Sequence, residues 1–387
     1  MLEKYIRKLL LACLILLGAS GYANAQMLSP DETAQLVSTT IKPILERNHV
    51  AGATVVLYNH GVPQAFYFGL ASRNQQNHVN ASTLFEIGSV TKIFTSVLLA
   101  YEVELGQLDL SDPAVMYLND APISNPFFDQ ITLAGLAAHV SGLAQMPAST
   151  IRNRHQLMQS LKTWRPAYKV NSWWRYSNIG FGILGYVLED ITHQSYQAFL
   201  KQQLLNPLNM NDTSLTGSPC LSCAQGYSWN GAPVTTTKTL LIIPAAGSIR
   251  SSGRDMLKFL GAALSLPGTP PELARAFQLT ERPYYQTQYG NQGLGWEIHD
   301  FNQLGSDGYI NTGTKILTLH SSSAYSLSGL DPQGLPMFDK TGSVAGFRAY
   351  MVLVPKQQTG LVILVNAAMP RTQVVLAARK VLYQLIN

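Results

Sequence analysis

The sequence predicts a two-lobed α/β fold, in which an antiparallel sheet flanked by helices carries an inserted, mainly helical lobe. Three observations lead to this fold class: strand-like runs near both ends of the 387-residue chain, helix-like runs broken by Pro and Gly in the middle, and a closing helix. Hydrophobic residues make up 46% of the chain and charged residues 13%, which suits a large buried core. We expect one domain, residues 26–387, with an α/β lobe formed by residues 26–105 and 290–387 and a helical lobe formed by residues 106–289.

The N-terminal part is predicted to contain a helix, a β-hairpin and a second helix. The two hairpin strands are rich in β-branched and aromatic residues and are joined by a turn that contains Gly61. Helical periodicity marks the first helix, and Gly106 ends the second. The expected ranges, in chain order, are 29–48, 53–58, 64–70 and 89–105.

The rest of the chain is predicted to be helical first and stranded later. Apolar residues recur at helical spacing through the middle third, whereas three later runs are β-branched and separated by turn residues. The expected helices of the middle third are 131–139, 154–163, 179–191 and 196–204. The expected C-terminal strands are 338–341, 347–354 and 361–365, followed by a helix at 372–386.

The first 25 residues are typical of an export signal. Basic residues precede the apolar run 9–17, and Ala23-Asn24-Ala25 matches a small-x-small cleavage site. The alternative is a membrane anchor, but the run is shorter than the roughly 20 residues that a spanning helix needs. We expect cleavage near Ala25 and a soluble mature protein, periplasmic or secreted, without a stable membrane anchor.

Charge and cysteine usage argue against several classes of function. The net charge is +5 and no Lys/Arg run occurs, so we expect no nucleic-acid partner. Cys220 and Cys223 are predicted to form a disulfide in an oxidising compartment, although the pair could also have no role. Zinc needs about four ligands and no second Cys or His pair lies nearby. Because the chain also lacks a Walker loop and a dinucleotide-binding Gly fingerprint, we expect neither metal nor cofactor.

Ser89 and Lys92 form the first of three motifs that indicate chemistry. Their spacing places both side chains on one face at the start of the predicted helix. A serine at a helix N-terminus lies near the positive end of the helix dipole, which favours a developing oxyanion. A buried Lys92 could act as a base or remain a cation that tunes its neighbours. Because this spacing also arises by chance in most chains of this size, the pair alone decides little.

Two further motifs follow in chain order. Tyr176-Ser177-Asn178 joins a Trp-rich segment to an apolar helix, so Tyr176 can face a cleft or be a core tyrosine with a satisfied hydroxyl. Lys340-Thr341-Gly342 lies on a predicted strand, where Gly342 allows a ligand to approach the strand edge; the alternative is a solvated edge lysine. Together the three motifs predict a serine acyl-transfer site that uses lysine and tyrosine in place of histidine.

This set of motifs resembles the penicillin-recognising serine enzymes, and among them the class C β-lactamases in particular. The resemblance covers nearly all of the mature chain and implies a β-lactamase/transpeptidase-like fold. The segments that carry it, besides Tyr176-Ser177-Asn178, are residues 85–92, 110–113, 131–133, 139–143, 293–297 and 340–347.

The resemblance also implies a role for each matching residue. Ser89 would be the acylated nucleophile, Lys92 and Tyr176 would assist proton transfer, and Lys340 would act on Tyr176 and on a substrate carboxylate. The backbone N–H groups of Ser89 and Ser343 would form an oxyanion hole. The substrate-binding residues implied are Gln145, Asn178, Thr341, Gly342, Ser343 and Arg371.

The chain departs from the family pattern at two places. Ala245-Ala246-Gly247 stands where the family usually has a tyrosine in the wall of the side-chain pocket. Arg371 stands where the family uses an asparagine to recognise a carboxylate. Arg371 could take over that task, because a guanidinium binds carboxylates in a bidentate fork, or it could be a solvated surface residue.

The implied function is a serine β-lactamase that hydrolyses penicillins and cephalosporins through an acyl-enzyme. The alternatives are a D,D-peptidase acting on peptidoglycan stem peptides, an esterase of the same fold, and a non-catalytic sensor module. The general base stays open between a neutral Lys92 and an ionised Tyr176, whose ionisation at pH 7 costs roughly 4 kcal/mol before nearby ammonium groups offset it. We expect a monomer whose partner is a small-molecule β-lactam or a stem peptide.

Overall fold

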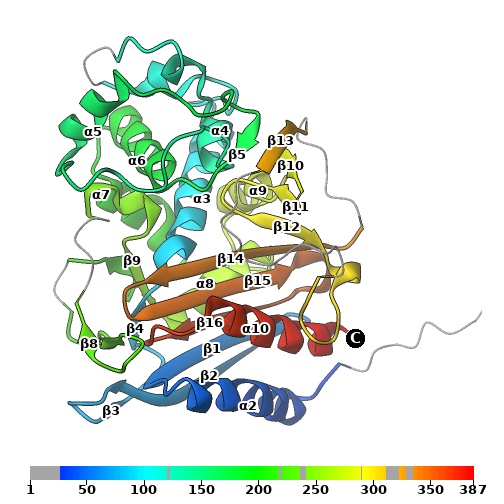
Figure 1. Ribbon diagram of the computed structural model, residues 1–387. Helices are drawn as coiled ribbons and strands as arrows, with labels where there is room; N and C mark the ends of the chain where they lie inside the picture. Colours follow the sequence, from blue (N-terminus) through cyan, green and yellow to red (C-terminus); the bar gives the residue numbers. More distant parts are fainter. Residues whose placement is uncertain are drawn as a thin grey trace, which may run out of the picture.

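An antiparallel sheet with helices on both faces forms the lower part of the molecule in Figure 1, and a group of helices lies above it. The predicted export signal lies outside the described residues. Among the described residues, no helix is both long and apolar enough to cross a bilayer. The computed structural model describes residues 27–119, 123–217, 220–235, 241–288, 290–310, 322–327 and 334–387.

The large sheet has the strand order β3-β2-β1-β16-β15-β14-β12-β11-β10-β13-β5. Its central strands are apolar and buried on both faces, because helices cover both sides. The bounds in that order are Asn77–His78, Val62–Ser72, Gly52–Asn59, Thr359–Val365, Phe347–Val354, Pro336–Val344, Glu297–Asp300, Gly290–Gln292, Tyr285–Thr287, Ser322–Ser326 and Trp173–Trp174.

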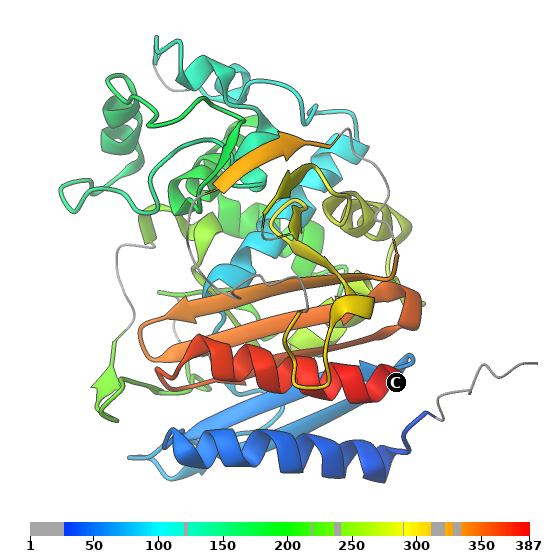
Figure 2. The same ribbon diagram turned by 45° about the vertical axis from the view of Figure 1, so that its right-hand side comes forward.

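Two terminal helices cover one face of this sheet. α2 (Pro30–Arg47) begins with a capping box formed by Ser29 and Glu32, and it packs beside α10 (Arg371–Ile386), as Figures 1 and 2 show. The predicted terminal helices, the first hairpin and the three C-terminal strands are therefore confirmed.

The helical lobe is built around α3 (Thr91–Glu104), which runs from the sheet into that lobe (Figure 1). α3 is buried on almost every side, because α6 and α9 pack against it. The α-helices between α3 and β10 are α4 (Leu133–Ala137), α5 (Arg154–Leu161), α6 (Asn178–Thr192), α7 (Tyr196–Leu200), α8 (Gly253–Ala263) and α9 (Pro271–Thr280).

One helix corrects the predicted division at residues 105 and 290. α8 lies within the range 106–289 assigned to the helical lobe, yet it packs on β1 and β16. A Cβ at Gly253 would lie 2.5 Å from the Thr54 side chain, so this glycine allows the close approach. β5 and β10 also belong to the large sheet rather than to a helical lobe, and strands of two or three residues are too short to show an alternating pattern.

A small three-stranded sheet contains β4, the strand that directly precedes the turn with Ser89. It has the order β4-β9-β6, with bounds Leu84–Glu86, Ile249–Ser252 and Ser214–Leu215. Cys220 and Cys223 form a disulfide with a Cα–Cα distance of 5.7 Å, which confirms the predicted pairing. This disulfide loop hydrogen-bonds Leu84 on both sides, and a separate hairpin of β7 (Gly226–Tyr227) and β8 (Pro233–Val234) follows it.

Candidate active site

Ser89 lies in a 3₁₀ turn (η1, Gly88–Val90) immediately before α3, and Lys92 lies on the first turn of that helix. Gly88 has φ +51°, a left-handed conformation that favours glycine. A Cβ at Gly88 would lie 2.7 Å from the backbone nitrogen of Ser343 on β14. The turn that carries Ser89 is therefore packed directly against the strand that carries the third motif.

The hydroxyl of Ser89 lies between two groups that can move a proton. The Tyr176 hydroxyl is 2.6 Å from Ser89 Oγ, and Lys92 Nζ is 3.2 Å from the same atom. Tyr176 comes from the junction between β5 and α6, where the Ser177 side chain caps the helix by accepting from the Gly180 N–H. The structure therefore brings Lys92 and Tyr176 together at the Ser89 hydroxyl, as the sequence predicted.

Lys92 is fully buried and is held by two neutral acceptors. Its Nζ lies 2.7 Å from Asn178 Oδ1 and 2.5 Å from the carbonyl oxygen of Ala246. Burial, and then the charge of Lys340, hold the pKa of Lys92 well below the ordinary lysine value. A neutral amine suits this environment, because its two N–H groups can satisfy the two neutral acceptors, and Nζ also lies 3.2 Å from Ser89 Oγ.

The pKa of Tyr176 is shifted in the opposite direction, upward. Burial raises the pKa of its phenol above the ordinary value, although the hydrogen bond with Ser89 lowers it in part. Tyr176 therefore keeps its proton near pH 7. The opposite directions of the two pKa shifts favour Lys92 over Tyr176 as the group that accepts the serine proton.

His139 packs against Tyr176, although it was not among the residues predicted for the site. Its ring centroid lies 4.3 Å from that of Tyr176, and its Nδ1 accepts the backbone N–H of Ser177 at 3.2 Å. Burial and then the charge of Lys340 hold the pKa of His139 well below its usual value, so the ring is neutral. The sequence signal that pointed to it is the segment 139–143, whose first residue has the left-handed φ of +63°.

Lys340 faces Tyr176 from the other side. Its Nζ lies 5.1 Å from the centroid of the Tyr176 ring, and Lys92 Nζ lies 5.0 Å from the same centroid. Lys340 is buried, which lowers its pKa, but Glu297 and then Asp339 raise it. Lys340 therefore keeps more of its positive character than Lys92 does.

Gly342 and Ser343 place the edge of β14 against the turn that carries Ser89. A Cβ at Gly342 would collide with the carbonyl oxygen of Ile87, so a larger residue would push the strand away. This contact brings the backbone of Ser343 next to Gly88, the residue before Ser89. The oxyanion hole implied for the N–H groups of Ser89 and Ser343 stays a prediction.

The other predicted binding residues lie around this centre. The carbonyl of Gln145, whose residue is exposed, accepts the backbone N–H of Asn178 at 2.9 Å. Asn178 Oδ1 is already engaged by Lys92, so Asn178 positions the amine and retains only Nδ2, 3.0 Å from the sulfur of Met146, for a substrate amide. Thr341 is half-buried on β14.

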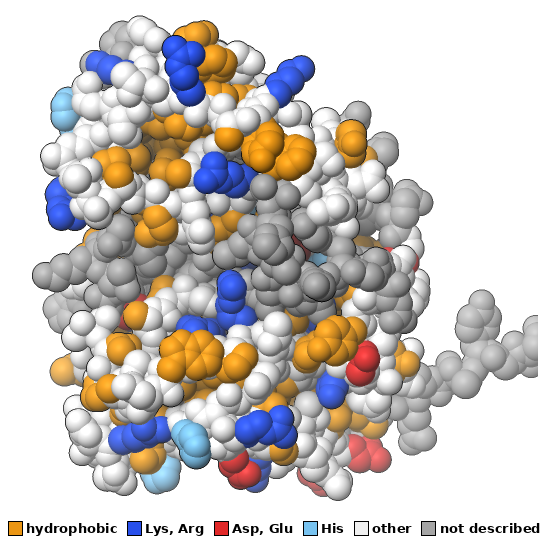
Figure 3. Space-filling model, viewed as in Figure 1, with side chains coloured by type: hydrophobic (Ala, Val, Ile, Leu, Met, Phe, Trp, Pro, Cys, Tyr) orange, Lys and Arg blue, Asp and Glu red, His pale blue; other side chains and the backbone are white. Residues whose placement is uncertain are grey.

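Arg371 is the first residue of α10 and is half-exposed. Burial raises the pKa of both Tyr176 and Glu297, and the charge of Arg371 opposes this rise weakly. Figure 3 shows a few Lys and Arg side chains near the level where the two lobes meet. Positive charge there suits an anionic substrate.

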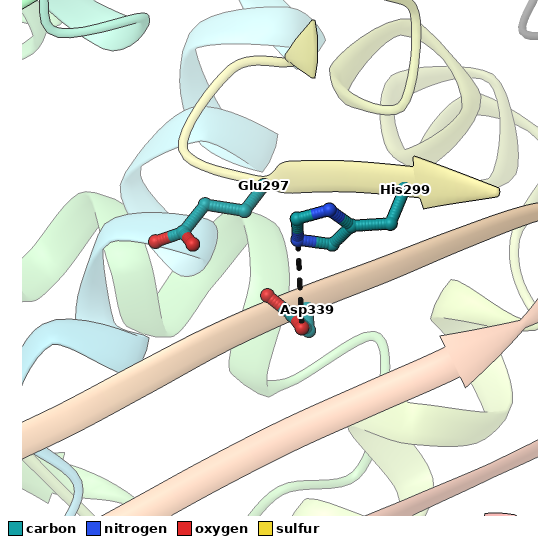
Figure 4. Close-up of side chains that lie close together, drawn as sticks. All are labelled: Glu297, His299 and Asp339. Carbon is teal, nitrogen blue, oxygen red and sulfur yellow. Dashed lines mark ion pairs between the residues drawn. The ribbon is translucent and has the colours of Figure 1, made fainter. Parts of the chain in front are cut away.

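One buried cluster behind Lys340 has the composition of a metal site. Ligand atoms of Glu297, His299 and Asp339 lie within 4.8 Å of one another (Figure 4). Asp339 is, however, already bonded to the guanidinium of Arg379, and Lys340 acts on Glu297. A divalent cation here would face two fixed cations, so the cluster does not fit a metal.

Comparison with known proteins assigns the family. A family model described as Beta-lactamase matches residues 37–385. The chain belongs to the beta-lactamase family. A beta-lactamase of Lysobacter lactamgenus is 30% identical over 368 residues, which cover 94% of this chain and 95% of the relative.

Two solved structures show the same fold. A D-alanine carboxypeptidase of Burkholderia cenocepacia matches with a TM-score of 0.83 and 29% identity. The match covers 92% of this chain and 99% of the carboxypeptidase chain. A class C beta-lactamase in complex with cefoxitin has a TM-score of 0.84 and 27% identity, over 91% and 98% of the two chains. The predicted fold and the predicted resemblance to class C are therefore confirmed.

Proposed function

We propose that this protein hydrolyses the β-lactam amide of penicillins and cephalosporins through an acyl-enzyme on Ser89. One observation carries the proposal: Ser89 Oγ lies within hydrogen-bonding distance of both a buried amine and a buried phenol. Membership of the beta-lactamase family and the similarity to a class C enzyme in complex with cefoxitin support the substrate class.

Acylation begins with Ser89 Oγ attacking the lactam carbonyl carbon. The hydroxyl proton passes to the neutral Nζ of Lys92, which is 3.2 Å away. The carbonyl oxygen takes the developing negative charge between the backbone N–H groups of Ser89 and Ser343. As the C–N bond of the lactam breaks, the Tyr176 hydroxyl donates its proton to the leaving nitrogen and is reprotonated by the Lys92 ammonium.

Deacylation uses Lys92 and Tyr176 again, in the reverse order. After acylation Lys92 is neutral again and Tyr176 is protonated, so a water molecule near Ser89 can lose a proton to this pair and attack the ester carbonyl. The ester C–O bond breaks, and Ser89 Oγ recovers a proton from the same pair. Lys340, Thr341 and Arg371 hold the substrate carboxylate during both steps.

A D,D-peptidase is the second candidate function, because one similar solved structure is a D-alanine carboxypeptidase. A peptidase of this kind forms the same acyl-enzyme, so the two functions differ in how fast the β-lactam adduct is hydrolysed. Export of the protein is part of either proposal, since peptidoglycan lies outside the cytoplasm. The disulfide between Cys220 and Cys223 supports an oxidising location.

Incubation of the purified mature protein with a chromogenic cephalosporin separates the candidates. Repeated turnover supports the β-lactamase, whereas one equivalent of stable adduct without turnover supports the peptidase. The Ser89→Ala variant is the matched control, since it keeps Lys92 and Tyr176 but lacks the nucleophile. Turnover that survives in Ser89→Ala would reject both candidates.

A further inference from the structure

The two faces of β14 carry opposite charges. Adjacent residues of a strand point to opposite faces, so Lys340 faces Tyr176 and Asp339 faces α10. Asp339 Oδ2 accepts a hydrogen bond of 2.6 Å from the Tyr350 hydroxyl and a charged hydrogen bond from Arg379 Nη2. Arg379 lies on α10 with its side chain 2% exposed, and its Nε donates to the Tyr350 oxygen at 2.8 Å.

A second carboxylate lies opposite Asp339 in the neighbouring strand. β12 pairs with β14 so that Glu297 faces Asp339, and His299 Nε2 lies 4.0 Å from Asp339 Oδ2 (Figure 4). Burial lowers the pKa of His299 to about 4, so this histidine is neutral near pH 7. Two like charges directly opposite each other destabilise a strand pair, and the guanidinium of Arg379 offsets the charge of Asp339.

We propose that Arg379 is a positioning residue for the acyl-transfer site: by neutralising Asp339 on the back of β14, it sets the electrostatic field at Lys340 on the front. The inference rests on the proposed function for its effect on catalysis, but not for its effect on Lys340. Arg379 touches neither Ser89 nor its two proton-transfer partners in any contact that the structure describes. Its action passes through Asp339, the residue joined to Lys340 by one peptide bond.

The charges that face Lys340 come from several elements. Glu297 on β12 and Asp339 on its own strand favour its protonated form, while burial disfavours it. Lys340 in turn lowers the pKa of Lys92 on α3. The other groups near enough to interact, directly or through Glu297, are Tyr176, His139, Arg371 and Arg379. With Arg379 and Asp339 paired, Glu297 supplies the negative charge that remains beside Lys340.

Removing the charge of Asp339 and removing the charge of Arg379 should therefore shift the pKa of Lys340 in opposite directions. Asp339→Asn leaves the Arg379 cation uncompensated, which lowers the pKa of Lys340. Arg379→Met leaves the Asp339 anion uncompensated, which raises it. A unit charge at this range shifts a pKa by on the order of one unit. The double variant removes both charges and should return Lys340 to the wild-type value.

The test is an NMR titration of the Lys340 side chain in selectively labelled full-length mature protein, assigned by loss of its signal in Lys340→Met. We expect a downward shift in Asp339→Asn, an upward shift in Arg379→Met, and restoration in the double variant. Tyr350→Phe is the matched control: it removes a hydrogen bond to Asp339 without changing a charge, and it should leave the Lys340 midpoint in place. Shifts of equal sign in the two single variants, or no shift, would overturn the proposal.

A kinetic readout separates this inference from the proposed function. In an active enzyme, the high-pH limb of β-lactam acylation should move with the Lys340 midpoint in each variant. If wild-type protein is not acylated at all, the proposed function fails while the titration still decides the role of Arg379. If a single variant does not fold, Arg379→Lys replaces Arg379→Met: it keeps the charge, so a shift as large as that expected for charge removal would overturn the proposal.

Discussion

Lys92 and Lys340 are both buried against the same tyrosine ring, yet their surroundings differ. Lys92, at the start of α3, is bonded to an amide oxygen and a backbone carbonyl, which carry no charge. Lys340, on β14, lies near the carboxylates of Glu297 and Asp339. Burial lowers the pKa of both amines, but two carboxylates oppose this effect only at Lys340. The difference teaches that the partner groups distinguish the two roles.

This division gives each lysine one task. The neutral Lys92 can accept the proton of Ser89, while the charged Lys340 can attract a substrate carboxylate. The same division disfavours a Tyr176 anion as the base, because burial holds the phenol in its protonated form. The two assigned roles can be tested by replacing either lysine or the groups around them.

Replacing Lys92 should have the largest effect. Lys92→Met removes the proton acceptor of Ser89, and we expect acylation to slow about 10²- to 10⁴-fold, the usual contribution of general base catalysis. The measurement is the rate of labelling by a fluorescent penicillin. Lys92→Arg is the control, since it keeps a cation but cannot accept a proton, and it should be as slow. A fast Lys92→Arg variant would mean that charge, not basicity, is what this position supplies.

Replacing Lys340 should be selective. Lys340→Ala removes a charged partner of the substrate carboxylate, so we expect kcat/KM to fall about 10- to 100-fold for carboxylated lactams. Uncharged ester substrates should lose much less. The measurement is the ratio of the two losses, and equal losses would show that Lys340 does not act on the carboxylate.

Glu297→Gln tests what keeps Lys340 charged. Glu297 raises the pKa of Lys340, so its neutral replacement should lower that pKa. The protonated form of Lys340 would then be lost at a lower pH, and the high-pH limb of kcat/KM should move down by on the order of one unit. A pH profile of the variant checks this, and a limb that stays in place would assign the charge of Lys340 to another partner.

His139→Asn should have the smallest effect. Asparagine tolerates the left-handed φ of +63° and offers an acceptor to the Ser177 N–H, but it removes the ring beside Tyr176. We expect kcat to fall about tenfold or less, with KM unchanged, because only the position of Tyr176 is affected. A larger loss in KM than in kcat would place His139 in substrate binding instead.

The three motifs of the acyl-transfer site were readable from the sequence because each pairs a reactive side chain with a recognisable local structure. Ser89 precedes a long apolar helix, Tyr176 lies at a loop–helix junction, and Lys340 lies on a strand. The contacts between them were not readable, because they join segments far apart in the chain. The bond from Asn178 to Lys92 is an example, since Asn178 was expected to bind substrate.

The cluster behind β14 was missed for a different reason. Arg379 lies within the predicted terminal helix 372–386, and the buried residues Val375 and Leu382 lie four positions before it and three positions after it. That spacing was the available signal that Arg379 points inward. The predicted lobe boundaries failed at α8 because adjacency in sequence does not show which layer a helix covers.

The pH dependence of adduct formation on Ser89 tests the central claim most directly. The measurement is the pre-steady-state rate of acylation by a penicillin, with the modified residue identified by peptide mass. A neutral Lys92 predicts an adduct on Ser89 that forms at its plateau rate well below pH about 10.4, the ordinary pKa of lysine. An adduct on another residue, or a rate that climbs tenfold per unit up to that pH, would contradict the account.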